Sequence, residues 1–212
     1  MSGAGGAVLA CDVGGTKLAA ALIDADGRLV GRGRIVRTPS GPGADAEALF
    51  ATLLVLARET LADLPPGPAG AGPAVLGVGV GCGGPMSWPA GRVSPLNMPG
   101  WRDFPLRERL AERLQLAVRV HNDAVCMALG EHWRGAGRNG GDLLGMVVST
   151  GVGAGIVSGG RLIEGATGNA GHLGHVVVDP AGPPCTCGGR GCLEAVASGP
   201  SIAAWAHANG WR

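Results

Sequence analysis

One pattern occurs twice along this chain of 212 residues: an apolar strand, a glycine-rich turn and a second apolar strand that leads into a hairpin. In the first copy, predicted strands at 7–13 and 18–23 flank the turn DVGGTK at 12–17. In the second copy, a predicted strand at 143–149 precedes the turn TGVGAG at 150–155. The repetition predicts two related lobes that face one cleft, each contributing one phosphate-binding loop.

The first turn carries residues that suit an anion. Gly14 and Gly15 allow main-chain amides to approach a phosphate closely. Thr16 adds a hydroxyl and Lys17 a positive charge, while Asp12 could hold a hydrated Mg2+. A plain hairpin with one basic residue remains the alternative, because the spacing matches neither the dinucleotide-binding pattern nor the P-loop.

Helical and strand patterns alternate between the two copies. Apolar periodicity predicts helices at 45–63, 105–116 and 124–133. The continuous apolar run at 74–80 predicts a strand that is covered on both faces. This strand delivers the glycines at 81–85 to the carboxyl edge of the sheet. Open α/β sheets bind their ligands at that edge.

Two asparagines and one aspartate follow in this part of the chain. Asn97 lies between prolines, where its amide could bond a polar ligand, although a turn-forming role is favoured locally. Asn122 and Asp123 follow a predicted strand at 118–120 and precede the next helix, so that helix capping is one interpretation. The other is a general base, because a carboxylate held rigidly at a strand end can accept a hydroxyl proton.

A group of cysteines with metal-ligand spacing lies near the end of the chain. Cys185, Cys187 and Cys192, together with one imidazole, would form the Cys3His shell of a closed structural zinc site. Buried or oxidised cysteines are the alternative, but Cys185 and Cys187 are too close to pair comfortably. His175 and His172 are the two candidate imidazoles. His175 is preferred, because the three valines after it predict a strand that would mount the ligand rigidly.

Composition argues against several classes of function. A net charge of +1 with 16% charged residues provides no basic field of the kind that nucleic-acid binding uses. No apolar stretch reaches the ~20 residues of a membrane span, and no basic region precedes the N-terminal apolar run. We therefore expect no nucleic-acid or membrane partner and a cytoplasmic location. The content of 46% hydrophobic residues is sufficient for a sizeable core.

Several segments together resemble one family. They are CDVGGTK, SPLNMPGWRDFPLRERL, VHNDA, STGVGAGIV, GGRLIEGATGNAG and HLGHVVVDPAGPPCTCGGRGCLEAVASG. Over almost the whole chain the combination is similar to the ROK family of bacterial sugar kinases and sugar-responsive repressors, a branch of the actin-like ATPase superfamily. The resemblance implies an α/β, actin-like (ribonuclease H-like) two-lobe fold, with a first lobe at 1–117 and a partial second lobe at 118–212. It also implies ATP-dependent phosphorylation of a hexose hydroxyl, as in a glucokinase, with ATP, Mg2+ and structural Zn2+ as cofactors. The sugar would be the small-molecule partner, and the full-length form would be a homodimer.

The resemblance also implies roles for individual residues. Asp123 would be the catalytic base that accepts the hydroxyl proton. The residues that would contact the sugar are Gly84, Asn97, Asn122, Asp123, His172, His175 and Glu194. The first phosphate loop would comprise Asp12, Gly14, Gly15, Thr16 and Lys17, and the second Thr150, Gly151 and Gly153. The zinc ligands would be His175, Cys185, Cys187 and Cys192.

Two departures from the family pattern matter. His172 stands in GHLGH where the family's sugar kinases usually carry a glutamate, and this change predicts an altered hexose preference. Family members also continue beyond the length of this chain, so we expect a fragment with an incomplete second lobe and an incomplete purine pocket. Two alternatives to the kinase stay open. One is a sugar-responsive regulator that lacks its DNA-binding domain, and the other is a non-catalytic sugar-binding protein.

Overall fold

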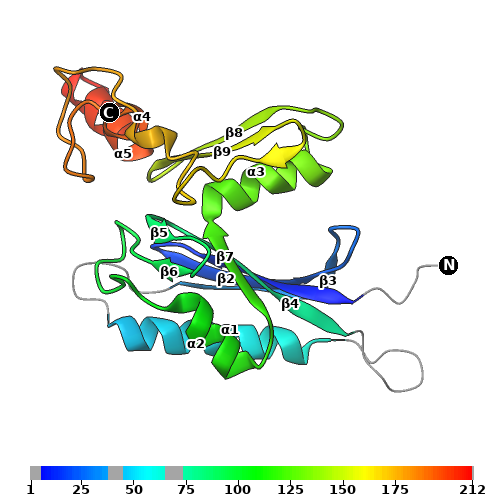
Figure 1. Cartoon of the computed structure of the whole chain (residues 1–212). Coiled ribbons are helices and arrows are strands. Elements are labelled where there is room, and N and C mark those ends of the chain that lie inside the picture. Colours follow the sequence, from blue (N-terminus) through cyan, green and yellow to red (C-terminus); the bar gives the residue numbers. More distant parts are fainter. Residues whose placement is uncertain (1–5, 38–44, 65–73, 212) are drawn as a thin grey trace. The chain divides into compact units, whose positions relative to one another are not determined.

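The computed structural model describes residues 6–37, 45–64 and 74–211 (Figure 1). The chain forms two compact units, Met1–Asp123 and Ala124–Arg212. The division expected before Val118 differs from this one. Strand β7 (Val118–Asn122) pairs in parallel with β4 (Val75–Cys82), and it therefore completes the sheet of the first unit.

The first unit is built on a five-stranded sheet with the order β3-β2-β1-β4-β7. Its first three strands are β1 (Ala7–Val13), β2 (Lys17–Ile23) and β3 (Leu29–Arg37). Strand β2 is antiparallel to both β1 and β3, so these three strands form an antiparallel meander. Strands β4 and β7 run parallel to β1. The carboxyl ends of β1, β4 and β7 therefore lie at the same edge of the sheet.

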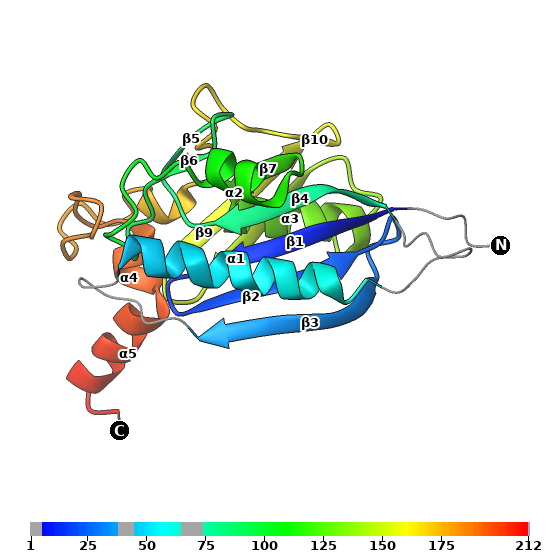
Figure 2. The same cartoon turned by 90° about the horizontal axis from the view of Figure 1, so that it is seen from below.

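Helices α1 (Ala46–Ala62) and α2 (Leu106–Leu114) cover one face of this sheet (Figure 2). Helix α1 begins where the sequence predicted, because the Asp45 side chain accepts the backbone N–H of Glu47 at 3.0 Å. Leu53 is fully buried at the interface, and burial of such a side chain stabilises the fold by roughly 1.5–3 kcal/mol. Among the described residues, no helix combines the length and the apolar character that crossing a membrane demands.

A short hairpin and a buried tryptophan complete the first unit. Strands β5 (Met86–Ser87) and β6 (Arg92–Val93) form the hairpin after β4. Trp101 is fully buried, and its ring stacks on Phe104 with 4.5 Å between ring centroids. Its Nε1–H donates to the carbonyl oxygen of Ala46 at 3.2 Å. These contacts anchor the loop that carries Asn97 onto the core.

The second unit has a three-stranded sheet against which α3 (Asp123–Arg134) packs. Its strands are β8 (Leu143–Val148), β9 (Val152–Ser158) and β10 (Arg161–Leu162), in the order β10-β9-β8. Glycines in β8 and β9 let the helix approach closely. A Cβ atom on Gly145 or Gly155 would lie only 2.8 or 2.6 Å from the Cβ of Ala128.

The remainder of the second unit comprises the 3-10 turn η2 (Leu173–His175) and the helices α4 (Leu193–Ala197) and α5 (Gly199–Ala208). The strand predicted for the three valines after His175 is wrong. Val177 forms only an isolated bridge with Cys192, and all three valines are about half exposed. Their backbone groups bond the cysteine loop instead of a sheet, since Val178 N donates to Gly191 O and Leu193 N to Val176 O, both at 2.9 Å.

Candidate functional site

Three parallel strands bring predicted site residues to one edge of the first sheet. The register places Asp12 of β1 opposite Gly81 of β4, and Cys82 of β4 opposite Asn122 of β7. The chain leaves β4 through Gly84 and leaves β7 into Asp123 at that same edge. Distant parts of the sequence therefore converge at the carboxyl edge, where α/β sheets bind ligands.

The first glycine turn joins β1 to β2 at this edge. Gly14 N donates to Lys17 O at 3.0 Å, which closes the turn. Thr16 and Lys17 are both exposed, so that their hydroxyl and ammonium groups are accessible to an anion. The turn therefore offers an exposed hydroxyl and an exposed ammonium group at this edge, while the Gly14 N–H is used within the turn itself.

Asn97 packs directly over this turn. A Cβ atom on Gly15 would lie 2.5 Å from Asn97 Nδ2, and one on Gly83 would lie 3.8 Å from Asn97 Oδ1. Asn97 also lies within a backbone turn, since Met98 N donates to Pro95 O at 3.2 Å. The turn-forming role that was favoured locally is present. The fold also places the Asn97 carboxamide between Gly15 and Gly83, so that this side chain contacts two loops of the site.

The loop around Asn97 is held by the guanidinium group of Arg102. Its Nη1 atom donates to the carbonyl oxygens of Pro95, Met98 and Trp101 at 2.7, 3.1 and 3.0 Å. Because these carbonyls lie on both sides of Asn97, the loop has little freedom to move its amide. Sequence reasoning missed this residue, because nothing in the local pattern shows that Arg102 folds back on the loop.

Two carboxylates interact electrostatically at the strand ends. Partial burial raises the pKa of Asp12, the charge of Asp123 raises that pKa further, and the charge of Lys17 lowers it. The effect of Asp123 on the pKa of Asp12 indicates that the two carboxylates repel each other across this edge. A divalent cation with oxygen ligands is the type of ion that such a pair attracts.

His121 is a second residue that sequence reasoning missed. Its Nδ1 atom accepts the backbone N–H of Asn122 at 2.8 Å. Its ring packs against the ring of Trp88, with 4.7 Å between ring centroids and 36° between ring planes. The histidine therefore holds the end of β7, from which Asn122 and Asp123 project. Its position next to Asn122 was visible in the sequence, but the partner ring comes from the β5–β6 hairpin.

The second glycine turn, between β8 and β9, bonds to Glu194. The backbone N–H of Val152 donates to Glu194 Oε2 at 2.9 Å. A Cβ atom on Gly151 would lie 2.5 Å from that oxygen, while one on Gly153 would lie 2.8 Å from the Cβ of Ala124. The close approach of α3 therefore favours glycine at position 153, while a side chain at position 151 would displace the Glu194 carboxylate. Thr150 is exposed.

The candidate metal ligands form a compact cluster. The ligand atoms of His175, Cys185, Cys187 and Cys192 all lie within 4.8 Å of one another. The contacts Cys185 Sγ–His175 Nδ1 and Cys187 Sγ–Cys192 Sγ are both 3.7 Å. A tetrahedral zinc ion with Zn–S bonds of ~2.3 Å and a Zn–N bond of ~2.0 Å separates its ligand atoms by roughly 3.5–3.8 Å. The two 3.7 Å contacts match this range, so the cluster is compatible with such an ion.

The environment of the thiols also suits a cation. Burial raises the pKa of the Cys192 thiol to about 12, and Cys192 is 1% exposed. A hydrogen bond from the backbone N–H of Gly189 lowers the pKa of Cys187. A bound divalent ion stabilises thiolates in such a loop and releases their protons. His172 lies outside the sulfur cluster, with its ring 6.4 Å from the ring of His175.

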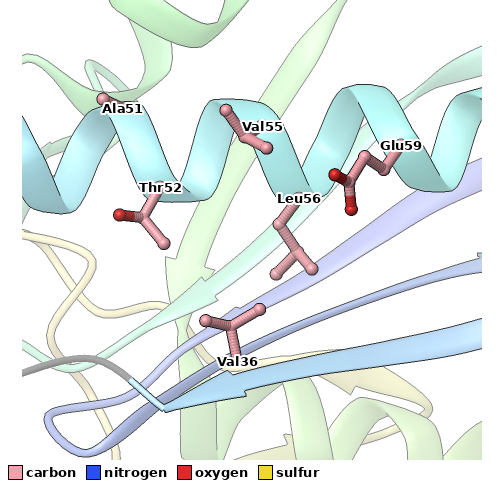
Figure 3. A pocket seen from close by; sticks show the side chains of 6 residues that line it. All are labelled: Val36, Ala51, Thr52, Val55, Leu56 and Glu59. Atoms are coloured by element: carbon pink, nitrogen blue, oxygen red, sulfur yellow. The ribbon is translucent and has the colours of Figure 1, made fainter.

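A pocket on the first unit lies apart from all of these residues (Figure 3). It is an open hollow between α1 and the edge strand β3. Its lining residues are Val36, Ala51, Thr52, Val55, Leu56 and Glu59. Apolar side chains dominate this lining, and none of the predicted site residues contributes to it.

The family model described as the ROK family matches residues 8–211. The chain belongs to the ROK family. A glucokinase from Halalkalibacterium halodurans is 38% identical over 193 residues, which cover 91% of this chain and 56% of that protein. An N-acetylmannosamine kinase from Escherichia fergusonii is 41% identical over 201 residues, which cover 94% of this chain and 64% of that protein.

Solved ROK structures share the fold. The crystal structure of a ROK family glucokinase from Streptomyces griseus, in complex with glucose and AMPPNP, has a TM-score of 0.79 and 34% identity. The match covers 95% of this chain and 60% of that one. This chain therefore has the α/β architecture of the actin-like ATPases, as the resemblance implied. It spans between 56% and 64% of the length of the two curated relatives.

Proposed function

We propose that this chain supplies the sugar-binding and phosphate-binding core of an ATP-dependent hexose kinase. One observation carries the proposal. Three parallel strands end at the same edge, and this edge carries a glycine turn with a lysine, two asparagine amides and a pair of electrostatically coupled carboxylates. Phosphoryl transfer to an alcohol needs these components: positioned phosphates, a held hydroxyl and one base.

In the proposed reaction, Asp123 accepts the proton of the sugar hydroxyl as this oxygen attacks the γ-phosphorus of ATP. The bond to the β–γ bridging oxygen breaks, and the bridging oxygen leaves on ADP. The amides of Asn97 and Asn122 would orient sugar hydroxyls beside Gly84. Asn97 is well suited to this role, because the loop on both sides of it is pinned to Arg102. Orientation of this kind lowers the entropic part of the barrier.

The phosphates would be bound by the two glycine turns. In the first turn, the Gly14 N–H is used to close the turn on Lys17 O, so the Gly15 amide would approach the phosphates beside Thr16 and Lys17. The exposed Thr150, with Gly151 and Gly153, would provide the second phosphate turn. Asp12 would hold hydrated Mg2+, which neutralises phosphate charge when it is bound. The carboxylate pair at the strand ends supports this assignment.

We infer that the Cys3His cluster holds a structural Zn2+, since the spacing of its ligand atoms fits a tetrahedral ion. A closed shell of four protein ligands leaves no position for a substrate, so that the ion would stabilise the loop that carries His175. His172, adjacent to this loop, is our candidate for a shifted hexose preference. The family resemblance further supports a cytoplasmic location and a homodimer of the complete protein.

The test is an ADP-release assay with Mg-ATP over a panel of hexoses that includes glucose and N-acetylmannosamine. It is run on this chain and on a version extended to the length of its relatives. Asp123→Asn should lower kcat by at least ~1000-fold while sugar affinity stays within about threefold. Asp26→Asn, which removes an exposed carboxylate in a surface ion pair with Arg28, is the matched control. Unchanged turnover by Asp123→Asn would refute the assignment of the base.

A further inference from the structure

Val152 is contacted from both sides by segments that also carry metal-ligand candidates. Its backbone N–H donates to Glu194 Oε2 at 2.9 Å, and Glu194 lies two residues after Cys192. Its carbonyl oxygen lies against Gly174, where an added Cβ atom would be only 2.0 Å away. Gly174 directly precedes His175. The first residue of β9 is therefore held between the segment that carries His175 and the segment that carries Cys192.

The same C-terminal segment also holds the other side of the second glycine turn. Gly199 N donates to the carbonyl oxygen of Ser149 at 2.7 Å. Ser198, which caps α5, donates its own backbone N–H to Glu194 O at 3.0 Å. The residues on both sides of the Thr150–Gly151 pair are thus bonded to one short stretch, residues 194–199. A change in the shape of the turn would break one of these two bonds unless this stretch moves with it.

The position of that stretch depends on the cysteine loop. Helix α4 begins directly after Cys192 and is five residues long, which is too short for independent helical stability. The start of α4 is bonded to the segment that follows His175. The Leu193 N–H donates to Val176 O at 2.9 Å, and Cys192 forms an isolated β-bridge with Val177. A metal ion held by His175 and Cys192 would therefore join the two segments that hold Val152.

We propose that Glu194 is a positioning residue, through which the metal cluster sets the shape of the second glycine turn. Occupation of the cluster orders α4, α4 places the Glu194 carboxylate, and this carboxylate holds the Val152 amide, so that the turn is preformed for phosphate. The role of the turn in phosphate binding rests on the proposed function. The mechanical link to Val152 rests only on the inferred zinc site and not on the role of the turn in phosphate binding.

Two substitutions at Glu194 distinguish the effect of its hydrogen-bond acceptor from the effect of its charge. The Oε1 atom of a glutamine can accept the Val152 N–H, but the side chain carries no charge. Alanine removes the acceptor altogether. If the acceptor is what shapes the turn, Glu194→Gln should keep the Val152 amide protected from exchange and Glu194→Ala should not. Rescue by the conservative variant is therefore part of the test.

The first experiment measures amide hydrogen exchange at Val152 by NMR. Zinc-loaded wild type, chelator-treated wild type, Glu194→Ala and Glu194→Gln are compared. The exchange rate of the Val152 amide should rise roughly tenfold in the metal-free protein and in Glu194→Ala, as expected for loss of one hydrogen bond to a charged acceptor. It should stay near the wild-type rate in Glu194→Gln. The amide of Val80 in β4, which lies in the other unit, serves as the control.

The second experiment measures the affinity of the same proteins for inorganic triphosphate with Mg2+, and separately for glucose. Triphosphate affinity should fall about tenfold in Glu194→Ala and in the metal-free protein, and it should be retained in Glu194→Gln. Weakening of glucose binding alone would overturn the proposal and leave Glu194 as a sugar ligand only.

The two experiments test different parts of the proposal, and their outcomes can be told apart. Unchanged Val152 exchange in both Glu194→Ala and the metal-free protein would disprove the link from the metal to the turn. If the wild type binds no triphosphate, the phosphate role of the turn fails. The exchange measurement still decides the coupling in that case.

Discussion

Asn97 and Gly15 are in contact although they lie 82 positions apart in the sequence, and no side chain fits between the Asn97 amide and the Gly15 backbone. A Cβ atom at Gly15 would lie 2.5 Å from Nδ2, and the Asn97 loop cannot retreat because Arg102 bonds its carbonyls. The proposed sugar-binding amide and the proposed phosphate turn therefore support each other. A displacement of the turn at Gly15 therefore also displaces the Asn97 amide.

Gly15→Ala should therefore displace the Asn97 amide. For the proposed kinase reaction, we expect KM for the sugar to rise at least about tenfold. We also expect the fold to lose about 1–2 kcal/mol, because the overpacked site is held on both sides. Steady-state kinetics and urea denaturation measure the two effects. Gly79→Ala in β4 is the control, because an added Cβ at Gly79 meets no atom within 4 Å. Equal behaviour of the two variants would contradict the role of the contact.

Asp12→Asn should stabilise the protein at pH 7 in the absence of Mg2+. The native pKa of Asp12 is raised by partial burial and by the charge of Asp123, so its ionised form is disfavoured in the folded state. Stability is therefore lost as the pH rises from the unfolded pKa, ~3.9, through the native pKa. The extra stability of Asp12→Asn should be present above the native pKa of Asp12 and vanish below about pH 3.9.

Urea denaturation of the wild type and of Asp12→Asn across this pH range tests the sign of the difference in their unfolding free energies. Asp123→Asn is the companion variant, since removal of its charge lowers the native pKa of Asp12 and should reproduce part of the gain. Addition of Mg2+ should stabilise the wild type more than Asp12→Asn. A stabilisation by Asp12→Asn that grows as the pH falls would show that the pKa shift has the opposite direction.

His121→Phe should lower kcat of the proposed phosphoryl transfer roughly five- to tenfold, as expected for loss of one net hydrogen bond. Phenylalanine keeps a ring against Trp88 but cannot accept the Asn122 N–H, so the end of β7 becomes less well held. The KM for ATP should not change. Trp88→Phe keeps the acceptor and is expected to have a smaller effect. If His121→Phe kept the wild-type kcat, His121 would have no role in positioning Asp123.

Gly191→Ala should abolish stable zinc binding, whereas Gly188→Ala should only weaken it. A Cβ atom at Gly191 would lie 1.5 Å from Asp179 O at a backbone φ of +66°. Gly188 also has a positive φ, +91°, but an added Cβ there meets no atom within 4 Å. Zinc content measured after dialysis is expected at about one ion per chain in the wild type. Full zinc content in Gly191→Ala would exclude the loop geometry described above.

Most of the secondary structure could be predicted from local pattern. The strand at Ala7–Val13 and the helix capped by Asp45 are present as expected, because apolar periodicity and a capping side chain act within a few residues. Prediction failed at the three valines after His175. Their β propensity is real, but their backbone partners belong to the cysteine loop, and no ladder forms.

The sequence by itself determined the chemistry that is available: the glycine turns, the carboxylates, and a Cys-x-Cys spacing that suits a metal. Local rules specify these features, because turns and ligand spacings depend on a few neighbouring residues. Only the tertiary structure decided which of them meet. The parallel pairing of β1, β4 and β7 brings Asp12 to the same edge as Asp123, and Glu194 reaches Val152 through a loop that folds back on β9. Such contacts join residues far apart in the chain, and local propensity carries no information about them.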